Sequence, residues 1–244
     1  MSNELAKVSN YAVVKSENVD FKSILEANIG GEQIDQFALD RVKVPGAGGI
    51  AWEVPTLEGV DMAKTVEGVI VGWKTVRSLY LTPFTGGGEP PVCSSDDGTI
   101  GIGDPFEKGQ AGQHDCSTCP HNQWGSALDG KGKRCSERRL VFMLRENDML
   151  PIMISFPPTS IKPLANYFLR LTQAGLYYWD VVTTLSLEKT KSQGGIDYAI
   201  IKPAVLQRLT AEVAEKFKAY HEFFAQCVMS NVTFDPSYID SNSD

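Results

Sequence analysis

The chain of 244 residues has no apolar run long enough to cross a lipid bilayer. Its first residues, MSNELAKVSN, are polar and contain no hydrophobic core of a signal peptide. Internal repeats and long low-complexity runs are also missing. These absences predict a globular cytoplasmic protein that does not span or enter a membrane. In such a reducing compartment, clustered cysteines more often bind a metal than form disulfides.

The signatures of common enzymes are missing as well. The chain has no Gly-x-x-x-x-Gly-Lys-[Ser/Thr] phosphate loop and no His-Glu-x-x-His motif. His114-Asp-Cys116 precedes Cys119 without the glutamate that zinc deaminases require. The paired carboxylates Asp96 and Asp97 lie in a Ser-Ser-Asp-Asp-Gly segment, which is typical of a turn. We therefore expect a non-catalytic protein.

Positive charge is scarce, and it is absent from the C-terminal end. The net charge is −7, and no Lys or Arg follows Lys218. Residues 131–145 are the exception, with six basic residues against one acid, Glu137: Lys131, Lys133, Arg134, Arg138, Arg139 and Arg145. Such a cluster favours contacts with phosphate groups despite the negative total. A solvated surface that only keeps the protein soluble is the alternative.

Cysteine is also rare, yet four of the five cysteines can form one metal site. Cys93, the C-x2-C pair Cys116 and Cys119, and Cys135 span a segment with few large aliphatic residues. A bound metal would supply the folding free energy that this segment lacks, because structural zinc binding is coupled to folding. Four thiolates suit tetrahedral structural Zn²⁺ and leave no position for an activated water. An iron–sulfur cluster, a disulfide framework or no metal remain alternatives.

Three further residues bear on this site. His114 and His121 flank the C-x2-C pair, and either could replace Cys93 as a ligand. Cys227 lies far away in a helical pattern and is expected to be a small buried hydrophobic residue.

The hydrophobic pattern predicts the element order β-β-β-α-β-β. The expected strands are 66–81, 138–145, 150–156, 178–190 and 196–201, with a helix capped by Ser160 and stopped by Gly175 between the third and fourth. A short helix over 20–29 precedes them, and Pro203 is expected to open a long helix to about 228. Gly68 and Gly72 predict bends or bulges in the first strand. This order is that of an OB-fold, whose first loop can bind oligonucleotides or oligosaccharides.

We therefore expect a mainly β fold with helices (α+β), built on an OB-fold-like five-stranded barrel. The expected parts are an N-terminal extension (1–60), the barrel core (61–205) with an inserted metal-binding subdomain (83–137), a C-terminal helix (203–230) and an acidic tail (231–244).

Four motifs in the metal-binding subdomain carry a resemblance: Cys93-Ser-Ser-Asp-Asp-Gly, Cys116-x-x-Cys119-Pro, Asn122-Gln-Trp-Gly-Ser and Gly130-Lys-Gly-Lys-Arg-Cys135. In outline, residues 60–205 resemble phage single-stranded DNA-binding proteins and the zinc-bearing domain of replication protein A. The cysteine spacing departs from that of replication protein A. The resemblance implies structural Zn²⁺ and a protein that coats single-stranded DNA during replication or recombination of a phage or mobile element. Replication or recombination proteins are the implied partners, and host cytoplasm is the implied location.

Binding of single strands needs cations for phosphates and flat rings for bases. Trp73 and Arg77 share one face of the first strand, and alternation places Phe142 of the second strand in the core. Trp124 either caps the metal core or presents its ring to a base. The expected nucleic-acid-binding residues are Trp73, Arg77, Trp124, Lys131, Lys133, Arg134, Arg138, Arg139 and Arg145.

The alternative function is a zinc-stabilised module that binds a host or viral protein and no nucleic acid. Salt dependence separates the two, because phosphate contacts weaken steeply with salt. A homo-oligomer is compatible with either reading.

Overall fold

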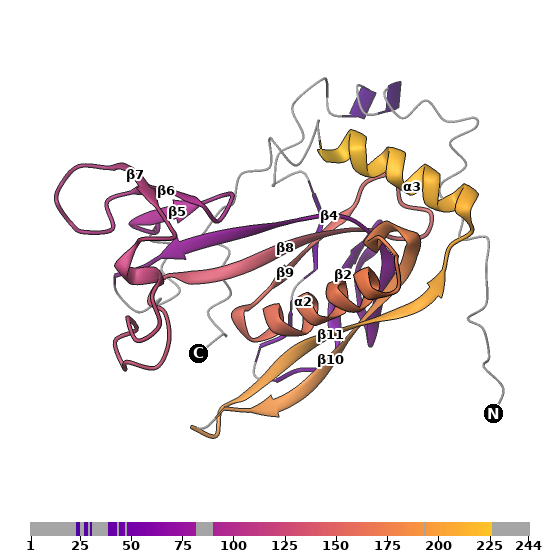
Figure 1. The fold of residues 1–244 in the computed structure, drawn as a ribbon. Coiled ribbons are helices and arrows are strands. Elements are labelled where there is room, and N and C mark those ends of the chain that lie inside the picture. The colour runs from indigo at the N-terminus through magenta and orange to yellow at the C-terminus, as the bar shows by residue number, and fades with distance from the viewer. Residues whose placement is uncertain are drawn as a thin grey trace.

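The computed structural model describes residues 23–24, 27–28, 30, 39–42, 44–46, 48–81, 90–192 and 194–225. In these residues the fold is mixed α+β and mostly sheet, with the helices α2 (Pro158–Gln173) and α3 (Ala211–Phe224) packed against it (Figure 1). None of the helices in the described part is long and apolar enough to cross a membrane.

The sheet is organised around one long strand, β4 (Thr65–Leu79), which pairs with three others. Its partners are β8 (Ser136–Leu144), β10 (Val181–Lys191) and β5 (Cys93–Ser95), all antiparallel. Beyond β8, the sheet continues through β9 (Ile152–Phe156) to β1 (Arg41–Val42). Beyond β10 lies β11 (Asp197–Arg208). Beyond β5, the sheet continues through β6 (Ile100–Gly103) to β7 (Gly112–Asp115). A separate hairpin joins β2 (Trp52–Thr56) to β3 (Gly59–Ala63), and two short 3₁₀ helices are η1 (Pro120–Asn122) and η2 (Tyr178–Asp180).

The predicted order β-β-β-α-β-β is observed as β4, β8, β9, α2, β10 and β11. The register between β4 and β8 shifts between Ile70 and Gly72, which confirms the expected bulge. Gly68 permits a close approach, because a Cβ there would lie 2.6 Å from the Leu144 carbonyl oxygen. The connection between β4 and β8, residues 80–135, is called the insertion below. Its described part extends from the far end of these two strands (Figure 1).

The expected closed barrel is not found in the described part of the chain. There β11 pairs with β10 alone, and β9 pairs with β8 and with β1. The short strand β1 takes the second edge of β9, where the Met153 amide donates to the Asp40 carbonyl. Helix α2 contacts β11 instead, and the Ser160 hydroxyl accepts from the Ile201 amide (3.0 Å). Ser160 is thus buried in the first turn of α2 and is not its N-cap, which is Pro157.

The expected long helix from Pro203 is also not found. Pro203 lies in β11 opposite Leu185. Proline is tolerated there because β11 is an edge strand among the described residues, so its missing N–H breaks no ladder. The helix α3 begins at Ala211 after Thr210, whose hydroxyl accepts from the Val213 amide.

Both faces of the central strands are buried. On one face of β8, Val141 and Met143 pack with α2. On the other face, Leu140 and Phe142 pack with α3, and the rings of Phe142 and Phe224 lie 5.2 Å apart. The prediction that Phe142 belongs to the core is confirmed. Neither of these two clusters contains a residue of the insertion.

Several predictions fall wholly or partly outside the described residues. These are Cys227, the acidic tail 231–244, the end of the C-terminal helix beyond 225, most of the N-terminal extension and residues 83–89 of the metal-binding subdomain. Of the short helix expected over 20–29, residues 23–24 and 27–28 are described and are helical.

Candidate metal centre and nucleic-acid surface

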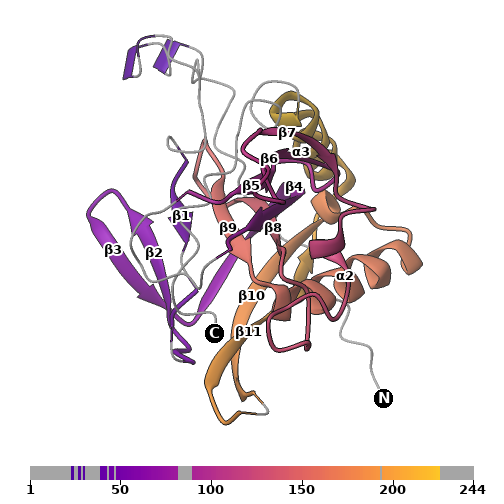
Figure 2. The same cartoon turned by 90° about the vertical axis from the view of Figure 1, so that its left-hand side faces the viewer.

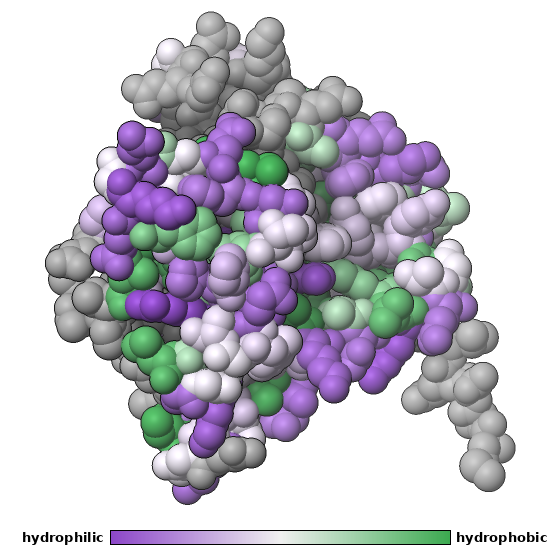
Figure 3. Space-filling model, turned by 60° about the vertical axis from the view of Figure 1, so that its left-hand side comes forward, coloured by the Kyte–Doolittle hydropathy of each residue, from purple (hydrophilic) through white to green (hydrophobic). Residues whose placement is uncertain are grey.

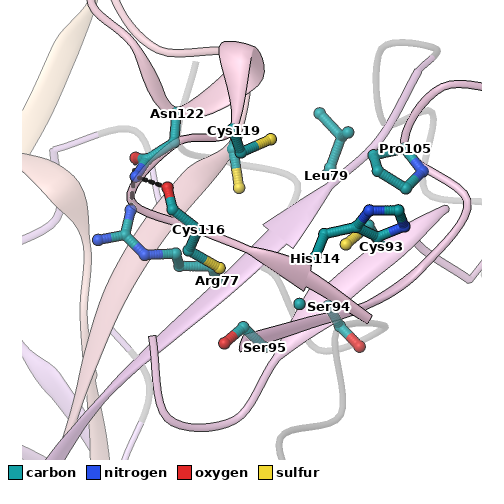
Figure 4. Close-up of a pocket in the computed structure, with 12 residues that line it drawn as sticks. Arg77, Leu79, Cys93, Ser94, Ser95, Pro105, His114, Cys116, Cys119 and Asn122 are labelled. Carbon is teal, nitrogen blue, oxygen red and sulfur yellow. Dashed lines mark hydrogen bonds between the residues drawn. The ribbon is translucent and has the colours of Figure 1, made fainter. Parts of the chain in front are cut away.

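The four predicted ligand cysteines line one small pocket between the insertion and the end of β4 (Figure 4). Cys93 opens β5, Cys116 and Cys119 follow β7, and Cys135 directly precedes β8. Two backbone bonds bring these segments together, from the Cys116 amide to the Thr99 carbonyl and from the Cys135 amide to the His121 carbonyl. All four thiols are free. The sequence spacing therefore identified residues that the fold gathers in one place.

Gly101 of β6 provides the space in which two of the sulfurs lie. A Cβ at this position would stand 2.8 Å from Cys93 Sγ and 3.7 Å from Cys116 Sγ. The distance of 2.8 Å is shorter than a real Cβ contact, so a side chain at residue 101 would displace Cys93. Gly101 is a component of the site that sequence reasoning missed.

Burial is the main influence on the thiols. It raises the pKa of Cys93 to about 11 and that of Cys135 to about 12, and the neighbouring cysteines add to both shifts. Burial also raises the pKa of Cys116. In this arrangement no three His, Cys, Asp or Glu side chains of the described residues meet the geometry of a metal site. The thiols are neighbours in one pocket without forming a finished coordination shell.

The two flanking histidines are engaged by backbone carbonyls. His114 Nε2 donates to Gly103 (3.0 Å), and His121 Nε2 donates to Pro105 (3.0 Å). Both rings also contact Phe106. His114 lines the cysteine pocket, whereas His121 is not among its lining residues.

Arg77 and Asn122 connect the insertion to β4. Asn122 donates to the Cys116 carbonyl (2.6 Å), and its side-chain oxygen accepts from Arg77 (2.6 Å). Arg77 also donates to the Gly98 carbonyl and forms an ion pair of 2.7 Å with Glu137. Each of its three guanidinium nitrogens therefore has a partner inside the protein, and the expected contact of Arg77 with nucleic acid stays a prediction. Asn122 lies in a quoted motif, but sequence reasoning gave it no role.

Most of the predicted basic run is held by neighbouring groups. Lys133 donates to the Asn122 side chain (3.1 Å), and Arg134 donates to the Leu81 carbonyl (2.8 Å). Arg145 pairs with Asp148 at 2.6 Å, and the buried Arg138 lies 3.4 Å from the Ser155 hydroxyl. Lys131 has an exposed position. The run is therefore not a strip of free cations.

Trp73 on β4 and Arg139 on β8 lie in contact. The guanidinium of Arg139 lies 4.8 Å from the centroid of the Trp73 ring, a cation–π distance. The Trp73 ring also lies 5.8 Å from that of Phe168 on α2. No carboxylate forms an ion pair with Arg139 in the part of the chain that is described.

Trp124 is 81% exposed, so its ring does not cap the cysteine pocket. Its loop is held to the rest of the insertion by bonds from the Gly125 amide to the Gly132 carbonyl (2.8 Å) and from the Ser126 hydroxyl to the His121 carbonyl (2.9 Å). The first of these places the Trp124 segment beside Lys131 and Lys133. Figure 3 shows a mainly hydrophilic surface in which hydrophobic side chains form small separate patches.

Comparison of the chain with protein-family models, with curated proteins and with solved structures finds no match. A function for this protein must therefore be argued from its own residues. Three features are available for that argument: the pocket of four thiols, the exposed Trp124 with its adjoining cations, and the Trp73–Arg139 pair.

Proposed function

We propose that this protein binds single-stranded DNA without catalysing a reaction, in the replication or recombination of a phage or mobile element. The proposed core is an OB-fold-like sheet that is open in its described part, with a zinc-stabilised insertion between its first two strands. The observation that carries the proposal is Trp124, an exposed ring on a segment whose backbone is bonded to the segment that contains Lys131 and Lys133. A ring of this kind offers a stacking surface to an unpaired base, and the cations offer contacts to phosphates.

The proposed metal is structural Zn²⁺, held by Cys93, Cys116, Cys119 and Cys135. Their shared pocket and the space left by Gly101 support this assignment. Because zinc binds thiolates, its binding would displace protons from these buried and partly buried thiols. The bound ion would supply folding free energy to a segment outside both hydrophobic clusters.

The Trp73–Arg139 pair is the second proposed contact. A guanidinium with no carboxylate partner in the described residues can approach a phosphate while remaining against the indole. Each guanidinium nitrogen of Arg77 already contacts a group of the protein, and its proposed role is to fix the insertion on β4.

The test is a fluorescence-anisotropy titration of the zinc-loaded protein with a labelled ~30-nucleotide oligomer, single- and double-stranded, at two salt concentrations. Single-strand binding that is tighter than duplex binding and eroded by salt supports the proposal. Trp124→Ala should weaken single-strand binding about 5- to 150-fold, from the ~1–3 kcal/mol of one base–aromatic stack. The matched control is Leu128→Ala in the same loop, which removes an exposed apolar side chain without a ring. Absence of binding at low salt would overturn the proposal.

One observation favours the second candidate, a zinc-stabilised module that binds another protein. Most cations of the basic run are engaged inside the protein, which lowers the charge available to phosphates. Under this function, partner affinity should change little with salt, and the labelled oligomer should not bind.

A further inference from the structure

Among the described residues, the hairpin of β2 and β3 has one unpaired strand edge, that of β3. Leu57 and Glu58 form its turn, and the ladder runs from the Thr56–Gly59 pair to the Trp52–Ala63 pair. In the described part of the chain, β3 pairs with β2 alone. Figure 2 shows the hairpin on the flank of the molecule, beside β1. An edge strand of this kind is a template for pairing with another chain.

The register identifies which backbone groups lie at that edge. Cross-strand pairs in an antiparallel ladder alternate between hydrogen-bonded and non-hydrogen-bonded. Pro55 has no N–H, and its carbonyl accepts from Arg145, away from β3. The Pro55–Val60 pair is therefore non-hydrogen-bonded, and so is the Glu53–Met62 pair two residues along. Val60 and Met62 thus direct their N–H and C=O groups outward.

The same two residues also expose their side chains. Val60 and Met62 are each 65% exposed and lie on one face of β3, and Leu57 at the turn is fully exposed. On the opposite face of the hairpin, Trp52 and Val54 are buried in the core. The Trp52 indole also donates to the Leu185 carbonyl (3.2 Å), which fixes the hairpin to β10. The edge is therefore a fixed surface with apolar side chains and with backbone groups that pair with no other strand of the described residues.

The negative charge of the hairpin indicates which kind of chain would pair with β3. Glu53, Glu58 and Asp61 are all exposed, and the one nearby cation in sequence is Lys64. A second copy pairing through β3 would bring two such sets of carboxylates together, which is unfavourable for cross-strand neighbours. Each copy also carries a net charge of −7. A strand that alternates basic and apolar residues would meet complementary charge and the two apolar side chains.

We propose that the outer edge of β3 is a docking site for an extended basic segment of another protein, which adds as a third strand to the hairpin. Backbone bonds to Val60 and Met62 would give affinity, and the acidic side chains would give the preference for a basic partner. This site is separate from the surface proposed for single-stranded DNA.

The first test uses the full chain and two synthetic ten-residue peptides, one alternating Lys and Val and the other alternating Glu and Val. The basic peptide should bind in an anisotropy titration, and at saturation it should slow hydrogen exchange at the Val60 and Met62 amides. The acidic peptide, and a basic peptide N-methylated along its bonding edge, should bind at least about 10-fold more weakly. Equal binding of the basic and acidic peptides would overturn the proposal.

Variants give a second test. Val60→Pro removes an outward N–H but no bond of the β2–β3 ladder, so the fold should persist while peptide affinity falls at least about 10-fold. Asp61→Lys should weaken binding of the basic peptide severalfold, whereas Leu169→Ser, at an exposed apolar site on α2, should not. Unchanged affinity in Val60→Pro with an unchanged circular dichroism spectrum would overturn the proposal. A dimer of the free protein that Val60→Pro abolishes would assign the edge to a second copy and overturn the proposed occupant.

Discussion

At the scale of single residues, the candidate metal centre depends on an absent side chain as much as on the cysteines. Gly101 faces the sulfurs of Cys93 and Cys116 because β6 pairs with β5 on one side and with β7 on the other. The cysteines could be predicted from their spacing, since a C-x2-C pair is a local signal. The role of Gly101 could not, because it arises from strand pairing between distant residues.

Gly101→Ala should therefore weaken zinc binding by about 10-fold or more, because the new Cβ would push Cys93 away from its neighbours. The measurement is zinc retention during titration with a chromogenic chelator. Gly112→Ala is the matched control, since a Cβ there would meet nothing closer than His114 Nε2 at 4.0 Å. Equal zinc affinity in the two variants would contradict the assignment.

Tyr167 should make the protein sensitive to alkali. Its hydroxyl lies 2.7 Å from that of Thr183, and burial raises the pKa of Tyr167 to about 12 from an ordinary pKa of 10. The neutral phenol is therefore favoured in the folded state. Its contribution to stability is complete below pH 10 and is lost as pH rises from 10 to 12, with a slope of at most about 1.4 kcal/mol per pH unit.

Urea unfolding of wild type and Tyr167→Phe at pH 8, 10 and 11 checks this expectation. The variant should lose less stability between pH 8 and pH 11 than wild type. The other buried tyrosines, Tyr178 and Tyr220, whose pKa values burial also raises, should leave a residual slope in both proteins. Identical pH dependence in the two proteins would rule out Tyr167 as a source.

At the scale of elements, the junction between β4 and the insertion depends on Arg77. It lies opposite Glu137 in the β4–β8 ladder and also binds Asn122 and Gly98. Arg77→Met should destabilise the insertion by about 3–5 kcal/mol, because a largely buried carboxylate loses its partner. The double variant Arg77→Met, Glu137→Gln should recover part of that loss. Thermal unfolding, monitored by hydrogen exchange in the insertion, measures the loss of stability in the single and in the double variant. Equal losses in the two variants would contradict a role for the ion pair.

The order of elements could be predicted from the sequence because long β-branched runs and the helical stripe of α2 are strong local signals. The helix predicted from Pro203 was wrong because proline is common in the first turn of a helix and is also tolerated in an edge strand. Only the pairing of β11 with β10 decides between a helix and a strand. The partners of Arg77 and of the basic run could not be predicted for a similar reason. The partner of Arg77 depends on strand register and that of Arg134 on a distant carbonyl, which spacing alone does not reveal. The Arg145–Asp148 pair, three residues apart, was within reach of sequence reasoning.

At the scale of the whole molecule, the two hydrophobic clusters lie outside the insertion and should not need the metal. Chelation should therefore loosen residues 90–135, including β5, β6 and β7, and leave the rest of the sheet and the helices α2 and α3 folded. In hydrogen-exchange mass spectrometry, we expect exchange in 90–135 to accelerate at least about 10-fold with chelator and to recover on adding Zn²⁺. The peptides of β8, β9 and α2 serve as the internal control. Cooperative unfolding of the whole chain on chelation would contradict this division.

The position of the insertion between β4 and β8 also bears on the order of folding. Strands separated by residues 80–135 must close a long loop before they pair, which costs conformational entropy and slows folding. All four cysteines have been synthesised once Cys135 is made, before β9, α2, β10 or β11 exists. A zinc ion captured by these cysteines would hold the end of β4 close to the point at which β8 begins, before β8 itself is made. The supply of metal during translation would then determine how fast the later strands pair with the sheet.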